Sequence, residues 1–193
     1  MGHGPQIKSA ERVKNEAYDY EPCFRYVRPI LQSADLAIGN LEVTLPGKPP
    51  YQGWPNFKSP DDLARALRIA GFDLPTTANN HSNDAGKNGV IQPINTLQSN
   101  GFYHTGTYRD SLEKELYHPL VVYKKGFKLA FLNYTYGTDQ KKHRPPTVVN
   151  VIDEVQIKRD LQQCQKLNVD ASIVLLHWGK EYQIDPSEKQ EQL

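Results

Sequence analysis

The chain has 193 residues, of which 23 are Lys or Arg and 22 are Asp or Glu, so its formal net charge at pH 7 is +1. This length suits a single domain, and a near-neutral charge without a basic cluster argues against non-specific nucleic-acid binding. No apolar stretch approaches the roughly 20 residues that a membrane-spanning helix needs. The composition therefore favours a globular domain.

The first half of the chain predicts helices and strands in alternation. Apolar residues at helical spacing indicate each helix, and the second one also has start signals at Ser59-Pro60-Asp61-Asp62 and a stop signal at Gly71. The predicted elements are a helix over residues 24–31, a buried strand over 35–39, a helix over 59–71 and a strand over 72–77.

The second half continues the alternation and adds a hairpin. Its predicted elements are a helix over residues 90–101, hairpin strands over 119–123 and 127–134, a helix over 155–167 and an apolar strand over 171–176. This order predicts an α/β domain whose central sheet is covered on both faces and is mixed because of the hairpin. Cys23 and Cys164 lie far apart in helical patterns, which favours two buried thiols over a disulfide.

Polar, ligand-type residues follow four of the apolar runs at the point where each run ends. The ends of these runs are Asn40-Leu41-Glu42, Asn79-Asn80-His81, Asn133-Tyr134 and His177-Trp178-Gly179-Lys180-Glu181. Carboxyl ends of parallel strands lie along one edge of an α/β sheet, where binding sites form. The sequence therefore predicts that Glu42, Asn80, His81 and His177 meet at one site.

The segment from Ala78 to Gly86 is the densest of these clusters, because it holds carboxamides, an imidazole and a carboxylate on one turn. Each buried polar group needs a partner, so this density favours a metal, a phosphate or a proton transfer. Simpler explanations compete: Asp84 could cap the following helix, and His177 could be a satisfied core histidine.

Two further simple explanations concern isolated residues. Asn40 and Glu42 could do no more than cap a turn. Three histidines have no other ligand-type residues near them in sequence and are interpreted as surface or loop residues. They are His104, His118 and His143.

Taken together, three motifs resemble those of the bacterial capsule-synthesis proteins of the CapA type, which are associated with poly-γ-glutamate. The motifs are Gly39-Asn40-Leu41-Glu42, then Ala78-Asn79-Asn80-His81 with Asp84, Gly86 and Gly89, then His177-Trp178-Gly179 with Glu181-Tyr182. The stretches from Asn133 to Gly137 and from His3 to Gln6 are similar to that family too. The family in turn resembles the calcineurin-like metallophosphatases, which sandwich two mixed sheets between helices and carry two metal ions at strand ends.

The resemblance implies roles for individual residues. Asn40 or Glu42 takes the place of the acidic motif that reaches the metals, and Asn80 and His177 match metal ligands. His81 matches the histidine that serves the leaving group. Asp84 is expected to share that catalytic role. The residues expected to contact the substrate are Asn79, Asn133 and Glu181.

Two departures from the family pattern affect the expected metal site. The family begins with a Gly-Asp pair before this chain and ends with a His-Pro-His segment beyond Leu193, so we expect residues 1–193 to be a single CapA-type domain that is incomplete at both termini. Asn40 also stands where phosphatases place a bridging Asp. We therefore expect divalent ions (Mn, Fe or Zn) to be poorly held, in one weak site built from Glu42, Asn80 and His177.

These expectations leave two main functions open. One is a metal-dependent hydrolase, phosphoesterase-like or acting on an amide-type bond, in capsule or poly-γ-glutamate biosynthesis. The other is a non-catalytic cell-envelope assembly or export factor that binds an anionic polymer, with the aromatic loop around Tyr51 and Trp54 as a polymer-contacting wall. A glycan-binding module is a third, less favoured hypothesis.

The resemblance also implies partners and a location. The expected partners are an anionic polymer, or a phosphate or amide substrate, and other capsule-synthesis proteins at the membrane, with no nucleic acid. The full-length protein is expected in the cell envelope, either membrane-anchored or periplasmic or extracellular, although no signal segment is visible in this chain.

Overall fold

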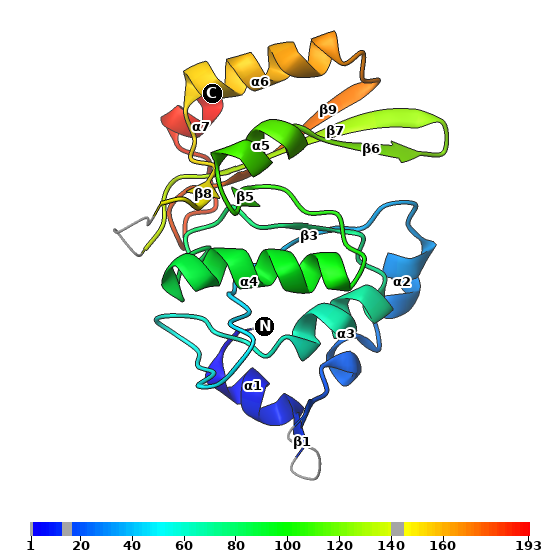
Figure 1. The fold of residues 1–193 in the computed structure, drawn as a ribbon, viewed down its shortest axis with the longest axis vertical. Coiled ribbons are helices and arrows are strands. Elements are labelled where there is room, and N and C mark those ends of the chain that lie inside the picture. The colour runs from blue at the N-terminus through cyan, green and yellow to red at the C-terminus, as the bar shows by residue number, and fades with distance from the viewer. Residues whose placement is uncertain (1, 13–16, 140–144) are drawn as a thin grey trace.

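A computed structural model describes residues 2–12, 17–139 and 145–193 and has the mixed α/β architecture expected from the sequence (Figure 1). The helical elements are α1 (Gly4–Ala10), the 3-10 helix η1 (Glu21–Phe24), α2 (Arg28–Ser33), α3 (Asp62–Ala70), α4 (Gly86–Ser99), α5 (Ser111–Tyr117), α6 (Glu154–Lys166) and α7 (Glu188–Gln192). The strands are β1 (Glu11–Arg12), β2 (Ala17–Tyr18), β3 (Ile38–Asn40), β4 (Leu74–Thr76), β5 (Thr107–Tyr108), β6 (Leu120–Lys124), β7 (Phe127–Thr135), β8 (Val148–Val149) and β9 (Ala171–His177).

The strands that carry the polar ends pair in parallel. β3 pairs with β4, with Asn40 opposite Thr76, and β7 pairs with β9, with Thr135 opposite His177. β6 joins β7 antiparallel, so the three-stranded sheet β6-β7-β9 is mixed, as predicted. The hairpin turns at Lys125 and Gly126, which both have positive φ, as a two-residue type I′ turn requires.

Side chains of β7 alternate between two packed faces, as the period of a strand dictates. Ala130, Leu132 and Tyr134 pack against α6, and Phe131 on the opposite face packs with Leu74 of β4. On the far side of β3 and β4, helices α3 and α4 complete the stack (Figure 1). The strands therefore form separate small sheets layered between helices, not the single central sheet that the alternation predicted.

Several of the predicted elements differ in extent from the observed ones, and three of the differences change the interpretation. The helix expected over residues 24–31 is divided into η1 and α2. The strand expected over 35–39 is shorter and half-buried, because only Ile38–Asn40 pairs with β4. Helix α3 ends at Gly71 with φ +110°, as expected, but Asp61 occupies its N-cap position and Ser59 does not cap it.

The predictions for isolated residues also need correction. Cys164 is buried but Cys23 is exposed, and both are free thiols. His118, predicted to be a surface or loop residue, lies in the connection between α5 and β6 but is buried beside Asp160. His104 is half-buried on the loop before β5, and His143 lies outside the described residues. Within the described chain, no helix combines the length and apolar character that crossing a bilayer requires.

Candidate functional site

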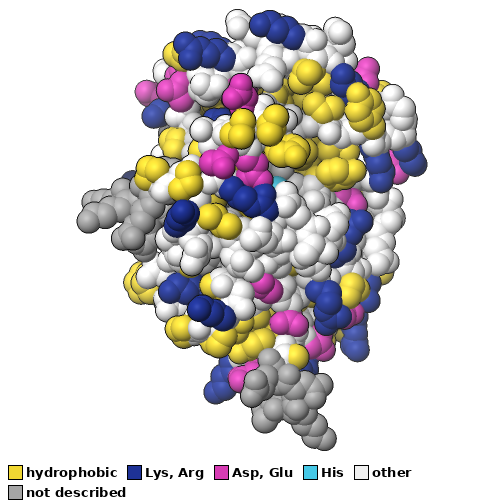
Figure 2. All heavy atoms as spheres, viewed as in Figure 1, with side chains coloured by type: hydrophobic (Ala, Val, Ile, Leu, Met, Phe, Trp, Pro, Cys, Tyr) yellow, Lys and Arg dark blue, Asp and Glu magenta, His cyan; other side chains and the backbone are white. Residues whose placement is uncertain are grey.

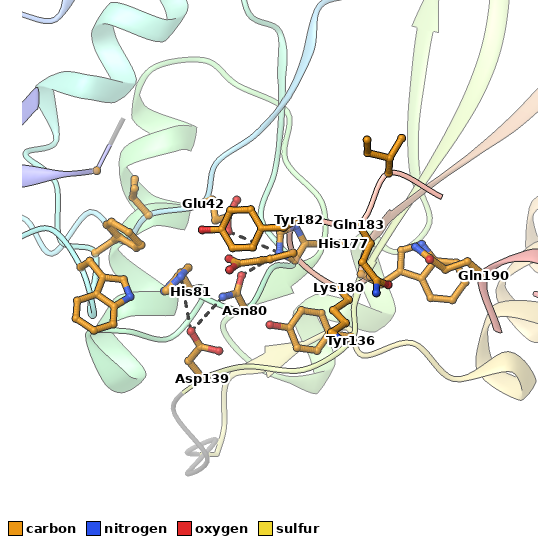
Figure 3. A pocket seen from close by; sticks show the side chains of 18 of the residues that line it. Glu42, Asn80, His81, Tyr136, Asp139, His177, Lys180, Tyr182, Gln183 and Gln190 are labelled. Carbon is orange, nitrogen blue, oxygen red and sulfur yellow. Dashed lines mark hydrogen bonds and ion pairs between the residues drawn. The ribbon is translucent and has the colours of Figure 1, made fainter. Parts of the chain in front are cut away.

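A pocket of about 1000 Å³ opens where β3, β4, β7 and β9 end (Figure 3). Its lining comes from parts of the chain that are far apart in sequence: the N-terminus, the segment after β3, the turn after β4, the segment after β7 and the segment after β9. The pocket also receives Trp54 of the Pro- and Gly-rich loop, whereas Tyr51 packs against Tyr18 instead.

Glu42, Asn80 and His177 meet on one wall of this pocket. The Nε2 atom of His177 lies 2.9 Å from Asn80 Oδ1 and 3.7 Å from Glu42 Oε1. The three side chains come from the segment after β3, the turn after β4 and the last residue of β9. The convergence predicted from strand ends is therefore present, and the competing interpretation of His177 as a core histidine is not supported, because it faces the pocket.

The carboxamides of Asn40 and Asn79 form a chain of hydrogen bonds behind that wall. Asn79 Nδ2 donates to the Leu41 carbonyl at 2.9 Å and to Asn40 Oδ1 at 3.0 Å. Asn40 Nδ2 in turn donates to Glu42 Oε2 at 3.1 Å and lies 3.4 Å from His177 Nδ1. Asn79 is fully buried and does not line the pocket. These two residues therefore orient Glu42 and His177 from behind, and Asn40 does more than cap a turn.

His81 and Asp84 form a buried pair, of which His81 lines the pocket. His81 Nδ1 lies 2.7 Å from Asp84 Oδ2, which also accepts a hydrogen bond from the Phe57 backbone N–H at 2.6 Å. Asp84 does not cap α4, whose N-cap residue is Ala85. Burial lowers the pKa of the imidazole, but the hydrogen bond and charge of Asp84 outweigh it, so the pKa of His81 is raised. The ring is therefore suited to hold a proton next to the pocket.

The segment after β7 contributes two side chains that the sequence patterns did not single out. Asp139 Oδ2 accepts a hydrogen bond from Asn80 Nδ2 at 3.1 Å and lies 3.6 Å from His81 Nε2. The Tyr136 ring stacks on His177, with centroids 6.1 Å apart and an interplanar angle of 17°. Both follow the Asn133-Tyr134 strand end, so extending the strand-end pattern by a few residues would have found them.

The remaining predicted substrate contacts lie in different surroundings. Asn133 is buried between the sheets, where Oδ1 accepts from the Ala78 N–H at 2.7 Å and Nδ2 donates to the Leu175 carbonyl at 3.1 Å. It therefore holds β4 to β9 and does not reach the pocket. Glu181 is exposed and lines the pocket.

Acidic side chains outnumber basic ones in the pocket lining. The carboxylates of the lining are Glu42, Asp139, Glu181 and Asp185, and its lysine is Lys180. Like charges repel, and a cleft lined by one sign of charge attracts ligands of the other sign. As it stands, the pocket favours a cation over an anion.

The ligand chemistry of the wall fits one divalent ion. Glu42, Asn80 and His177 offer a carboxylate oxygen, an amide oxygen and an imidazole nitrogen, and three protein ligands with open positions are typical of catalytic metal sites. Glu42 is 42% exposed, so the position is accessible. Within residues 2–12, 17–139 and 145–193, no group of three or more His, Cys, Asp or Glu side chains could hold a metal ion. An ion at this wall would therefore need the carboxamide oxygen of Asn80 as a ligand.

Comparison with known proteins identifies relatives of the chain. The family model described as "Bacterial capsule synthesis protein PGA_cap" matches residues 1–193. The chain is 29% identical to "Capsule biosynthesis protein CapA" of Bacillus anthracis over 95% of its own length, and 26% identical to "PGA biosynthesis protein CapA" of Bacillus subtilis (strain 168) over 88%. It spans 46% of the length of each of these relatives.

One solved structure has a weaker likeness. The crystal structure of a 5'-nucleotidase precursor from Thermus thermophilus aligns with 62% of this chain and 24% of its own chain, at 18% sequence identity and a TM-score of 0.44. A likeness at this level supports no conclusion about function.

Proposed function

The chain belongs to the bacterial capsule synthesis protein family, and on that premise we propose that it carries a metal-dependent hydrolase site that serves capsule, or poly-γ-glutamate, biosynthesis at the cell envelope. The observation that carries the proposal is the convergence of Glu42, Asn80 and His177 beside the His81–Asp84 pair. Ligands of this kind and an adjacent proton donor are the parts that hydrolysis needs.

Each part of the site has a distinct task in this proposal. Glu42, Asn80 and His177 would hold one divalent ion, and mixed oxygen and imidazole ligands suit Mn, Fe or Zn better than Ca. When bound, the ion supplies Lewis-acid polarisation of a phosphate or amide oxygen of the substrate. His81 donates a proton to the leaving group, and Asp84 holds its ring through Nδ1.

The acidic lining of the pocket also supports a metal requirement. A phosphate ester or an anionic polymer is repelled by Glu42, Asp139, Glu181 and Asp185, so a divalent ion is needed to compensate part of that charge before an anion binds. We expect the affinity for an anionic ligand to rise when Mn²⁺ is added and to fall when EDTA removes it.

Turnover of a chromogenic phosphodiester by the full-length protein, with Mn²⁺, Zn²⁺ or EDTA, tests the proposal directly. We expect metal-dependent hydrolysis that EDTA abolishes and that the His81→Ala variant loses. A folded protein that hydrolyses neither phosphodiesters nor amide-linked glutamate oligomers with any of these ions would contradict it.

A second function, envelope assembly by binding an anionic polymer without turnover, is favoured by two features. Asn40 stands at the acidic motif, which weakens a second ion position. The aromatic side chains of Trp54, Tyr136 and Tyr182 are exposed at the pocket, where they could contact a polymer. Capsule formation in cells separates the two functions, because His81→Ala removes the function of an enzyme but leaves a polymer-binding scaffold working.

The partners and the location follow the same premise. We propose that the protein works with other capsule-synthesis proteins at the membrane, and that residues 1–193 form a single CapA-type domain. Co-purification of the full-length protein with the membrane fraction of capsulated cells tests this, and its recovery free of membranes and of other capsule proteins would argue against it.

A further inference from the structure

The carboxamide of Asn80 lies between two groups with opposite hydrogen-bonding needs. Its Oδ1 atom is 2.9 Å from His177 Nε2, and its Nδ2 atom donates to Asp139 Oδ2 at 3.1 Å (Figure 3). An amide has one accepting end and one donating end. Only the oxygen end can bind a cation, so the orientation of this amide decides whether Asn80 is a ligand.

Asp139 imposes that orientation. An ionised carboxylate only accepts hydrogen bonds, so it favours the rotamer that turns Nδ2 toward it and Oδ1 toward Glu42 and His177. The reversed amide would place an oxygen against the Asp139 carboxylate and an N–H₂ group against the ring. A backbone bond, from the Asp139 N–H to the Asn80 carbonyl at 2.8 Å, holds the two residues together and keeps the carboxylate in place.

We propose that Asp139 is a positioning residue that fixes the Asn80 amide with its oxygen facing the ion position between Glu42 and His177. This inference rests on the proposed function, because it assigns to Asp139 a role toward the ion that the site would hold. The Asp139 carboxylate contacts the Nδ2 end of Asn80 and faces His81 Nε2 at 3.6 Å. It therefore acts on the ion through Asn80.

The expected size of the effect is moderate. Residues that orient metal ligands typically contribute 10- to 100-fold to metal affinity. Asp139 is 45% exposed, so solvent competes for its carboxylate, and we expect a loss near the lower limit, about tenfold.

The affinity of the intact protein for Mn²⁺, measured by isothermal titration calorimetry, tests the proposal. Asp139→Asn keeps the size of the side chain and the backbone bond, but it can present either end of an amide to Asn80, so we expect a loss of about tenfold. Asp185→Asn is the matched control, because it removes an equal charge from the same pocket lining without a contact to Asn80. We expect it to change the affinity less than threefold, about 0.6 kcal/mol.

A double-mutant cycle separates positioning from direct ligation and from general charge. In Asn80→Asp both ends of the side chain are carboxylate oxygens. An oxygen therefore faces the ion in either rotamer, and Asp139 has no orientation to select. In that background, Asp139→Asn should weaken Mn²⁺ binding no more than Asp185→Asn does. A tenfold loss in both backgrounds would show direct ligation by Asp139 and overturn the proposal.

The remaining outcomes distinguish this inference from the proposed function. Mn²⁺ binding that Asp139→Asn leaves unchanged, or reduces only as much as Asp185→Asn, would overturn the positioning role alone. Failure of the unsubstituted protein to bind Mn²⁺ would overturn the proposed metal site and this inference with it.

Discussion

Among the described residues, two clusters combine histidine, carboxylate and tyrosine side chains; one is open to the outside and the other is sealed. The open cluster consists of Glu42, Asn80, His81 and His177 and lines the large pocket, with Tyr136 beside it. The sealed cluster consists of Tyr108 of β5, His118 after α5, Tyr134 of β7 and Asp160 of α6, and all four residues are buried.

The sealed cluster is satisfied internally. Asp160 Oδ2 lies 3.0 Å from His118 Nε2 and accepts from the Tyr134 hydroxyl at 2.6 Å, while Tyr108 and His118 Nδ1 are 2.9 Å apart. Gln156 Nε2 donates to Asp160 Oδ1 at 2.8 Å. Each ring nitrogen and carboxylate oxygen therefore has a protein partner, and the cluster fixes α6 against the sheet.

The open cluster differs because part of its polar capacity is unused. Glu42 is 42% exposed and His177 is 26% exposed, and both side chains line the pocket. Polar side chains whose hydrogen-bonding atoms all have protein partners stabilise a fold. Polar side chains that face a pocket with unpaired hydrogen-bonding atoms are available to a ligand. Residue type alone does not distinguish the two clusters. On the face of the molecule drawn in Figure 2, only a small area of histidine is visible.

The largest expected effect is a loss of activity when the histidine of the open cluster is replaced, but not when that of the sealed cluster is replaced. His81→Gln should reduce turnover of a chromogenic phosphodiester by 10²- to 10⁴-fold, because proton transfer by a positioned group contributes about that much. Its free energy of unfolding should fall by no more than about 1.5 kcal/mol, the value of one hydrogen bond. His118→Gln is the matched variant in the sealed cluster and should leave turnover per folded molecule unchanged. Equal activity losses in both variants would break the comparison.

The next effect concerns stability. Asp160→Ala should lower the free energy of unfolding by about 3 kcal/mol, because it leaves the buried His118 and Tyr134 without their shared acceptor. Urea unfolding followed by circular dichroism measures the loss, and Mn²⁺ affinity at the pocket should stay the same. Glu154→Ala, at an exposed position of α6, is the control and should cost at most about 0.5 kcal/mol. A loss no larger than the control's would show that the sealed cluster does not hold α6.

A smaller effect appears in the pH dependence of stability. Burial alone would raise the pKa of the Asp160 carboxyl, but hydrogen bonds from His118, Tyr134 and Gln156 outweigh it and hold the pKa below its ordinary value of 3.8. A depressed folded-state pKa adds stability that is fully present above the unfolded-state pKa and is lost as the pH falls through the lowered value.

Urea unfolding between pH 6 and pH 2 measures this contribution. The unsubstituted protein should lose stability below about pH 4, and Asp160→Asn should be less stable at pH 6 and fall less steeply in acid. Parallel curves for the two proteins would assign the acid sensitivity to other carboxylates.

Much of the fold could be predicted from local patterns. The period of apolar residues and the signals at Gly71 and at Lys125-Gly126 identified α3, α4, α6 and the β6–β7 hairpin. Short elements such as α1, α5, β5 and β8 were missed, because the formation of such short helices and strands depends on tertiary contacts more than on sequence periodicity. The alternation of elements did not predict the division into separate sheets for the same reason, whereas the family resemblance implied more than one sheet between helices.

The site was predicted in part, and the sealed cluster shows where the prediction failed. Glu42, Asn80, His81 and His177 were identified because polar residues follow several strands in the same way. His118 was interpreted as a surface or loop residue without polar partners, because its partners Tyr134 and Asp160 lie 16 and 42 residues away in sequence. Asp139 was missed because it lies beyond a strand end, in a segment without a pattern of its own.

The smallest effect tests how the open cluster holds its histidine. The Tyr136 ring stacks on His177, and stacked aromatic pairs contribute about 0.5–1.5 kcal/mol. Tyr136→Ala should therefore weaken Mn²⁺ binding by about 2- to 10-fold, because the freed imidazole samples orientations that do not face Glu42.

Tyr136→Phe keeps the ring and should bind Mn²⁺ like the unsubstituted protein. Tyr182→Ala removes another aromatic ring from the pocket lining, one that is fully exposed, and should have no effect on Mn²⁺ affinity. If both alanine variants weaken binding equally, the rings act only by excluding water. If Tyr136→Ala alone does, a ring stack orders the histidine of the open cluster, whereas hydrogen bonds order the sealed one.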